Sequence, residues 1–185
     1  MFQTVSNQIT DSDNFDAEWR IPATVKHFLG DGATDKGYDR GNATISEEEL
    51  NAIHLPPYIA AIEQGVQSVM ASFNQVNGVH QHVDSLRLTV FLKKELGFDG
   101  YVIADWEGIE NSKSPGEAGN YSGSHTGVSS TEAVRNAINA GIDMAMVPQS
   151  ASTFIGSMKS LVSSGQISQE RLKDAVRRIL RVKIR

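Results

Sequence analysis

The pair of residues most able to do chemistry in this sequence follows a short apolar run. Asp105 and Trp106 come directly after the run 101–104. A carboxylate beside a large aromatic ring is the pairing that a sugar site needs: the carboxylate can act as nucleophile or general base, and the ring offers a stacking surface. Two other interpretations stay open on the motif alone, because Asp105 can cap a turn or helix and Trp106 can be a core residue.

Lys26 and His27 form a second candidate pair, inside the apolar run 24–28. Burying an unpaired ammonium group costs free energy, so Lys26 either reaches solvent at the strand end or pairs with a ligand or carboxylate. His27 taken alone can be a hydrogen-bonded structural histidine or a participant in catalysis.

Two further motifs carry weaker signals. Gly30-Asp31-Gly32 suggests a phosphate cradle, but its spacing fits neither the dinucleotide-binding fingerprint nor a P-loop with its lysine. His80-Gln81-His82 lacks a second cluster of ligands, which favours a polar loop over a metal pair. We therefore expect no metal and no cofactor.

Short β-branched and apolar runs, separated by helical patterns, predict the strands that would position these side chains; the runs are 24–28, 68–73, 101–104 and 144–147. This alternation predicts an α/β fold of about four βα units in one parallel sheet, with a loop rich in Gly and Ser at 111–130. Ligands bind at the carboxyl ends of such strands, so the polar residues at those ends are the candidates for a site.

Local signals mark the ends of the predicted helices. Ser46-x-x-Glu49 and Ser129-x-x-Glu132 fit the capping-box pattern, and glycines at 65, 97 and 141 follow helical stretches where a left-handed residue is expected. The arginines of the last helix are interpreted as a solvated face opposite its apolar stripe. That stripe consists of Leu172, Ala175, Val176, Ile179 and Leu180.

The composition excludes several classes of protein. The chain has 185 residues, no cysteine, and 17 Lys and Arg against 22 Asp and Glu, giving a net charge of −5. We expect no nucleic-acid partner and no membrane partner, because the charges are mixed and no apolar run approaches the ~18–20 residues of a membrane span. Disulfide scaffolds and cysteine zinc sites are excluded. The N-terminus lacks a signal-peptide pattern, and the localisation stays unassigned.

Taken together, the strand ends resemble glycoside hydrolase family 3, the family of β-glucosidases and exo-β-glucanases. The similar segments run in order from about Ala23 to the C-terminus. Residues 26–32 are similar to the family's K-H-F-x-G-D-G segment, 53–58 to its I-H-L-P-x-Y helix start, 69–78 to its V-M-x-S-[YF]-x-x-x-N-G strand, 103–109 to its [SA]-D-W-x-[GA] segment, and 175–183 to the closing helix of its barrel.

The resemblance implies a role for each matching position. Asp105 would be the nucleophile, forming a covalent glycosyl–enzyme intermediate. The residues that would bind the sugar are Lys26 and His27 through its hydroxyls, Trp106 by stacking, and Met70 and Phe73 as pocket walls.

Two segments refine the resemblance. The N-acetylglucosaminidase branch has a catalytic histidine where this sequence has Gly30-Asp31-Gly32, which favours glucoside and glucan substrates. Phe73 stands where other members have tyrosine, so it lacks the hydroxyl that can hydrogen-bond the nucleophile.

The resemblance also implies a fold, the second half of a TIM-type (β/α)8 barrel, since a full barrel takes ~250 residues. We expect residues 1–22 to form an irregular N-terminal segment and residues 23–185 a partial barrel of about four βα units. The second domain of the family, from which the acid/base carboxylate usually comes, is expected to be absent.

The expected function is that of a fragment of a retaining β-glucosidase or exo-β-glucanase, acting on β-glucosides or glucan oligosaccharides and weak or inactive alone. The open edges of a half-barrel predict self-association or pairing with a missing barrel half. The alternative is a catalytically silent, carbohydrate-binding or self-assembling half-barrel. An unrelated phosphate-binding α/β protein is a third interpretation.

Overall fold

The computed structural model describes residues 21–110, 112 and 130–185. Nearly all of the predicted N-terminal segment 1–22 and of the predicted loop 111–130 lies outside these described residues.

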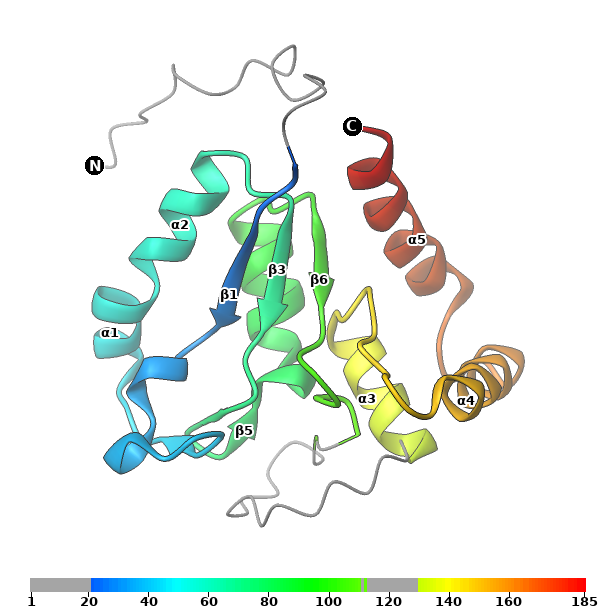
Figure 1. Cartoon of the computed structure of the whole chain (residues 1–185), viewed down its shortest axis with the longest axis horizontal. Helices are drawn as coiled ribbons and strands as arrows, with labels where there is room; N and C mark the ends of the chain where they lie inside the picture. Colours follow the sequence, from blue (N-terminus) through cyan, green and yellow to red (C-terminus); the bar gives the residue numbers. More distant parts are fainter. Residues whose placement is uncertain (1–20, 111, 113–129) are drawn as a thin grey trace.

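A three-stranded parallel sheet forms the centre of the molecule (Figure 1). Its strands are β1 (Thr24–Phe28), β3 (Ser68–Ala71) and β6 (Tyr101–Ile103), in the spatial order β1-β3-β6. Three of the four predicted strands are therefore confirmed, with β3 and β6 ending slightly earlier than predicted. Because all three point the same way, the residues that follow them meet at one edge of the sheet.

The fourth predicted strand, 144–147, is reduced to a single bridge between Met144 and β6. The Ala104 N–H donates to the Met144 carbonyl at 2.9 Å, and the Glu107 N–H donates to the Met146 carbonyl at 3.2 Å. The segment follows β6 in the parallel direction, but these hydrogen bonds are too widely spaced to form a continuous ladder. The prediction of a full strand here is therefore wrong.

A second, smaller sheet lies after the carboxyl ends of the main strands and was not predicted. It consists of β2 (Asn42–Ala43), β4 (Gln75–Val76) and β5 (Val79–His80), with β2 parallel to β4 and β4 antiparallel to β5. The β4–β5 turn is Asn77-Gly78, where φ is 50° and 82°. An Asn-Gly pair with both φ angles positive is the preferred two-residue hairpin turn, so the dipeptide was a usable signal.

Helices lie on either side of the strands, with α1 and α2 beyond β1 and with α3, α4 and α5 beyond β6 (Figure 1). The α-helices are α1 (Glu47–Glu49), α2 (Pro56–Glu63), α3 (Thr131–Ala140), α4 (Ala151–Ser163) and α5 (Gln169–Ile184). Segments with π-helical hydrogen bonding are η4 (Leu50–His54) and η6 (Leu86–Glu95). Short 3-10 turns are η2 (Asp31–Ala33), η3 (Asp35–Gly37) and η5 (Gln81–Val83).

The predicted helix caps are partly confirmed. Ser46 Oγ accepts the Glu49 N–H at 3.1 Å and caps α1. The cap predicted at Ser129 lies outside the described residues, and the N-cap of α3 is Ser130, whose Oγ accepts the Ala133 N–H at 3.0 Å. Ser130 has the extended backbone that an N-cap needs, although the capping-box spacing to Glu132 favours its neighbour. The glycines predicted to end helices all have positive φ: Gly65, Gly97 and Gly141.

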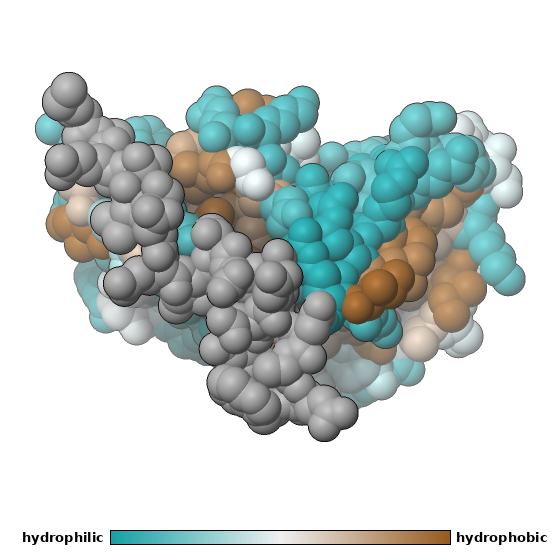
Figure 2. Space-filling model, turned by 90° about the horizontal axis from the view of Figure 1, so that it is seen from above, coloured by the Kyte–Doolittle hydropathy of each residue, from teal (hydrophilic) through white to brown (hydrophobic). Residues whose placement is uncertain are grey.

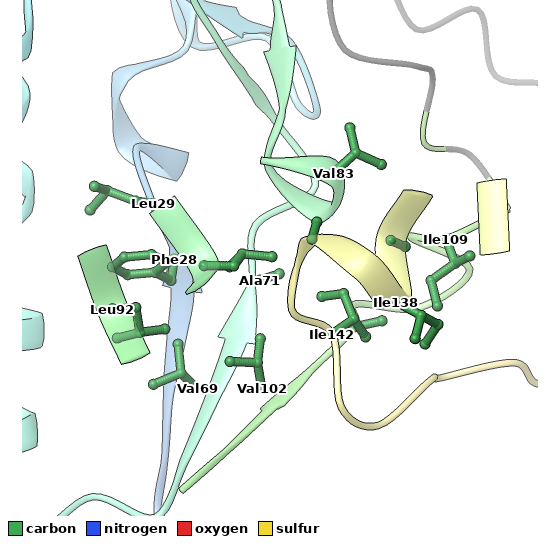
Figure 3. Packing of buried hydrophobic residues seen from close by; sticks show 14 of the residues in the cluster. Phe28, Leu29, Val69, Ala71, Val83, Leu92, Val102, Ile109, Ile138 and Ile142 are labelled. Atoms are coloured by element: carbon green, nitrogen blue, oxygen red, sulfur yellow. The ribbon is translucent and has the colours of Figure 1, made fainter. Parts of the chain in front are cut away.

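The hydrophobic core joins the strands to the helices around them (Figure 3). One end of the cluster contains Phe28, Val69 and Leu92, which come from β1, β3 and η6. The other end contains Ile138 of α3 and Ile142 just beyond it. This core fixes the carboxyl ends of the strands relative to one another.

Helix α5 is rotated relative to the prediction. Ala175 is buried, but Val176 and Leu180 are 45% and 47% exposed. The arginines are not a purely solvated face, because Arg178 donates to the carbonyls of Phe98 and Gly100 at 2.8 and 2.9 Å. These contacts turn part of the basic face towards the body of the molecule and part of the apolar stripe away from it.

A buried ionic cluster ties three elements together. Asp143 accepts the Val102 N–H of β6 and the Lys93 ammonium of η6, both at 2.8 Å, and it also pairs with Arg171 of α5. Burial lowers the pKa of Lys93 to about 8, and the nearby Asp143 carboxylate opposes this shift. Among the described residues, no helix is both long and apolar enough to cross a membrane.

Candidate active site

The carboxylate of Asp105 lies just past the end of β6, with its side chain 23% exposed. Its Oδ1 accepts the Trp106 N–H at 2.6 Å, and its Oδ2 lies 3.7 Å from His27 Nε2. The Asp105 backbone N–H donates to His82 Nε2 at 2.9 Å. The main chain and the side chain of this residue are therefore both held, with one carboxylate oxygen facing His27.

His27 links two carboxylates. Its Nδ1 lies 2.9 Å from Asp31 Oδ2, and its Nε2 faces Asp105 from the other side of the ring. The His27 carbonyl accepts the Tyr58 hydroxyl, which ties α2 to the end of β1. Burial raises the pKa of Tyr58 to about 12, so its hydroxyl remains a donor at neutral pH. The structure thus brings together His27 and Asp105, two of the residues singled out in the sequence.

The other candidate residues occupy different surroundings. Trp106 is 51% exposed beside Asp105, which removes the core interpretation of this residue. Lys26 is exposed, as the first of its two interpretations required. The Lys26–His27 peptide bond is cis. Met70 is half-buried in β3. The exposed indole and ammonium groups are available to a ligand arriving from solvent.

Phe73 is buried just beyond β3 and packs edge-on against His80 and His82, with ring centroids 5.8 and 6.1 Å away. The Arg40 guanidinium lies over the Phe73 ring, 4.3 Å from its centroid, in cation–π geometry. Sequence reasoning missed Arg40, which lies in an irregular loop where no periodicity or motif marks it.

The interpretation of His80-Gln81-His82 as a polar loop is wrong. All three side chains are buried, and His82 is 0% exposed. The β4–β5 hairpin turns the chain back towards the sheet, so the segment after it enters the interior. Burial lowers the pKa of His80 to about 4 and holds the pKa of His82 well below its ordinary value, with the nearby His80 as a smaller cause. Within the described residues, no group of three or more His, Asp or Glu side chains is arranged to hold a metal ion.

The chain matches a known family and known proteins over most of its length. Residues 8–182 match the family described as "Glycosyl hydrolase family 3 N terminal domain". The chain is 35% identical over 176 residues to a lysosomal beta glucosidase of Dictyostelium discoideum, a match covering 93% of this chain and 20% of that protein. It is 31% identical over 165 residues to a periplasmic beta-glucosidase of Salmonella typhimurium, with 89% and 20% covered. The chain therefore spans about one fifth of the length of these relatives.

The chain also resembles the solved structures of an exo-glucanase and a beta-glucosidase. The exo-1,3/1,4-beta-glucanase of a Pseudoalteromonas species is 44% identical with a TM-score of 0.75, and the match covers 87% of this chain and 18% of that one. The beta-glucosidase of Listeria innocua is 31% identical with a TM-score of 0.73, covering 88% and 21%. The α/β fold with parallel βα units of a TIM-type barrel is thereby confirmed. With a family match that extends over most of its length, the chain belongs to glycosyl hydrolase family 3.

Proposed function

We propose that this chain carries the nucleophile of a retaining β-glucosidase or exo-β-glucanase, and that Asp105 is that nucleophile. The observation that carries the proposal is the orientation of its carboxylate. Oδ1 is occupied by the Trp106 N–H, whereas Oδ2 faces His27 at 3.7 Å on a partly exposed side chain. An oriented, accessible carboxylate oxygen is what attack on an anomeric carbon requires.

The sugar would lie against the residues around Asp105. The exposed Trp106 indole offers a stacking surface, and Lys26 and His27 offer hydrogen-bond donors to hydroxyls. Phe73 and Met70 would form apolar walls behind it. A gluco-configured substrate is supported by the relatives, since the Listeria innocua beta-glucosidase has been solved in complex with glucose and a mutant of it in complex with laminaribiose.

The general acid of the reaction is proposed to come from outside these 185 residues. A retaining pair of carboxyl groups lies ~5–5.5 Å apart and flanks one glycosidic bond. Asp31 is the carboxylate on the far side of His27, and the imidazole between Asp31 and Asp105 prevents the two from flanking one bond. Hydrolysis of unactivated oligosaccharides by this chain alone is therefore proposed to be weak or absent.

A mechanism-based glycosyl donor tests this function without needing the general acid. In 2-deoxy-2-fluoro-β-glucosyl fluoride, an Asp105 carboxylate oxygen would attack the anomeric carbon while the C–F bond breaks and fluoride leaves. Intact-mass spectrometry should show one fluoroglucosyl group on the chain, and Asp105→Ala should show none. An unlabelled chain that still binds glucose in calorimetry would instead support the silent carbohydrate-binding alternative.

A further inference from the structure

His82 lies directly behind the proposed nucleophile and is 0% exposed. Its Nε2 accepts the Asp105 N–H at 2.9 Å. A ring nitrogen that accepts a hydrogen bond carries no proton, so a neutral His82 has its proton on Nδ1. The contact therefore requires one charge state and one tautomer of this ring.

The surroundings favour the neutral charge state, and the contact with the Asp105 N–H sets the tautomer. Burial, with a smaller contribution from His80, holds the pKa of His82 well below its ordinary value, although the Ser72 backbone acts in the opposite direction. A protonated ring would point an Nε2–H at the Asp105 N–H, and the hydrogen bond would be lost. Burial therefore favours the neutral ring.

The ring is also fixed in place by packing. A Cβ on Gly108 would overlap His82 Nε2, so the glycine backbone closes one side of the imidazole. Phe73 and His80 pack against the ring at centroid distances of 6.1 and 5.3 Å. The acceptor atom therefore has little freedom to move away from the Asp105 amide.

The Asp105 peptide is in this way held at two adjacent points. His82 fixes the amide of Asp105, and the next amide, of Trp106, donates to Asp105 Oδ1. We propose that His82 is a positioning residue: its neutral imidazole fixes the backbone turn that aims the Asp105 carboxylate and presents Trp106. The proposal rests on the proposed function of Asp105, and it assigns a task to a histidine that makes no contact with the substrate.

His80 provides a matched control. It is also a buried histidine, and burial lowers its pKa to about 4, but the Asp105 amide donates to His82 and not to His80. Its Nδ1 instead accepts the His82 N–H at 3.4 Å. A purely structural role for buried imidazoles would make the two positions equally sensitive to substitution.

The test compares His82→Leu, His82→Gln and His80→Gln in labelling by 2-deoxy-2-fluoro-β-glucosyl fluoride. A glutamine oxygen can take the place of Nε2 as acceptor, whereas leucine cannot. His82→Leu should lower the maximal labelling rate by about 10²-fold at unchanged half-saturation, as expected for a misplaced reacting group. His82→Gln should restore most of the rate. His80→Gln, which keeps the Nε2 contact of His82 and can still offer an acceptor to the His82 N–H, should lower the rate far less than His82→Leu. Equal losses in His82→Leu and His82→Gln, or a similar loss in His80→Gln, would overturn the proposal.

Nuclear magnetic resonance of the same chain separates this proposal from the proposed function. The ¹⁵N shifts of His82 should show an unprotonated Nε2 and a protonated Nδ1 between about pH 5 and pH 8, and the Asp105 amide proton should shift more in His82→Leu than in His80→Gln. A His82 ring that titrates in this range, or that is protonated on Nε2, refutes the contact. If the wild-type chain is not labelled at all, the proposed function and the catalytic part of this proposal both fail, while the resonance data still decide the contact.

Discussion

Two histidines in different environments lie against Asp105, one beside its carboxylate and one at its backbone amide. His27 is partly exposed and faces a carboxylate on each side, whereas His82 is fully buried and accepts the Asp105 amide. The first is open to solvent and can contact a ligand. The second can only hold the backbone. Two imidazoles near one carboxylate thus serve different purposes because their burial differs.

The sequence could predict part of this site and not the rest. Asp105, Trp106 and His27 were predictable because each lies at the end of a strand, where parallel sheets collect polar residues. The burial of His82 was not predictable from its own neighbours, because it follows from a hairpin that folds the segment inward. Arg40 reaches Phe73 across the chain from an irregular loop, so no local pattern marked it.

The buried His80 should make the protein sensitive to mild acid. Its pKa is about 4 in the folded chain and about 6.5 when exposed, so below pH 6.5 the unfolded chain binds a proton that the folded chain does not. The free energy of unfolding should therefore fall by about 2 kcal/mol between about pH 7 and about pH 5 from this group alone. Urea denaturation at the two pH values measures this loss. His80→Gln should show a smaller loss, and an equal loss in the variant would contradict this account.

At the scale of elements, strands were easier to predict than the rotation of helices. The runs that contain β1, β3 and β6 are rich in β-branched and apolar residues, a composition that favours strands. Helix α5 shows the opposite case. Its apolar spacing predicted a buried stripe, but the hydrogen bonds from Arg178 to the Phe98 and Gly100 carbonyls determine which face turns inward. Such contacts join residues about 80 positions apart, beyond the range of a periodicity argument.

The turn after β6 packs closely against His82. We therefore expect that a side chain at Gly108 would destabilise the protein. Gly108→Ala would place its Cβ against His82 Nε2, closer than two atoms can approach, so the ring must shift. We expect a loss of about 1–3 kcal/mol in unfolding free energy, typical of overpacking, together with slower labelling of Asp105. Gly156→Ala is the matched control, because Gly156 lies in α4 with nothing within 4 Å of its added Cβ. The control should be neutral or stabilising by about 0.5–1 kcal/mol. A Gly108 variant as stable as the control would be inconsistent with this packing.

The ionic cluster around Asp143 should contribute strongly to the attachment of α5. Asp143→Asn removes the charge that compensates the buried Lys93 and Arg171 groups, which leaves two cations facing a neutral amide. We expect a loss of about 3–5 kcal/mol in unfolding free energy, measured by chemical denaturation. Asp174→Asn is a suitable comparison, because Asp174 pairs with Arg171 and Arg178 at a 42% exposed position and should cost less than about 1 kcal/mol. Similar losses in the two variants would contradict the assignment of the buried cluster.

At the scale of the whole molecule, hydrophobic side chains reach the surface along α5. Val176, Leu180 and Ile184 follow one another at intervals of four residues and are 45%, 47% and 81% exposed. Viewed from above, hydrophobic atoms lie at the surface between hydrophilic ridges (Figure 2). An apolar row of this kind favours association with another apolar surface.

We expect the isolated chain to self-associate through this row. Sedimentation velocity should show species larger than a monomer whose proportion rises with concentration. Leu180→Glu should shift the distribution towards monomer, because it introduces a charge in the middle of the row, while Lys173→Glu on an exposed polar position of the same helix should not. A wild-type chain that stays monomeric at every concentration would count against the expectation.

The central claim concerns Asp105, and the site of covalent attachment tests it most directly. After reaction with 2-deoxy-2-fluoro-β-glucosyl fluoride, peptide mapping by tandem mass spectrometry should locate the fluoroglucosyl group on Asp105. Attachment to Asp31 or another carboxylate, or no attachment to a folded chain that is saturated with the reagent, would contradict it.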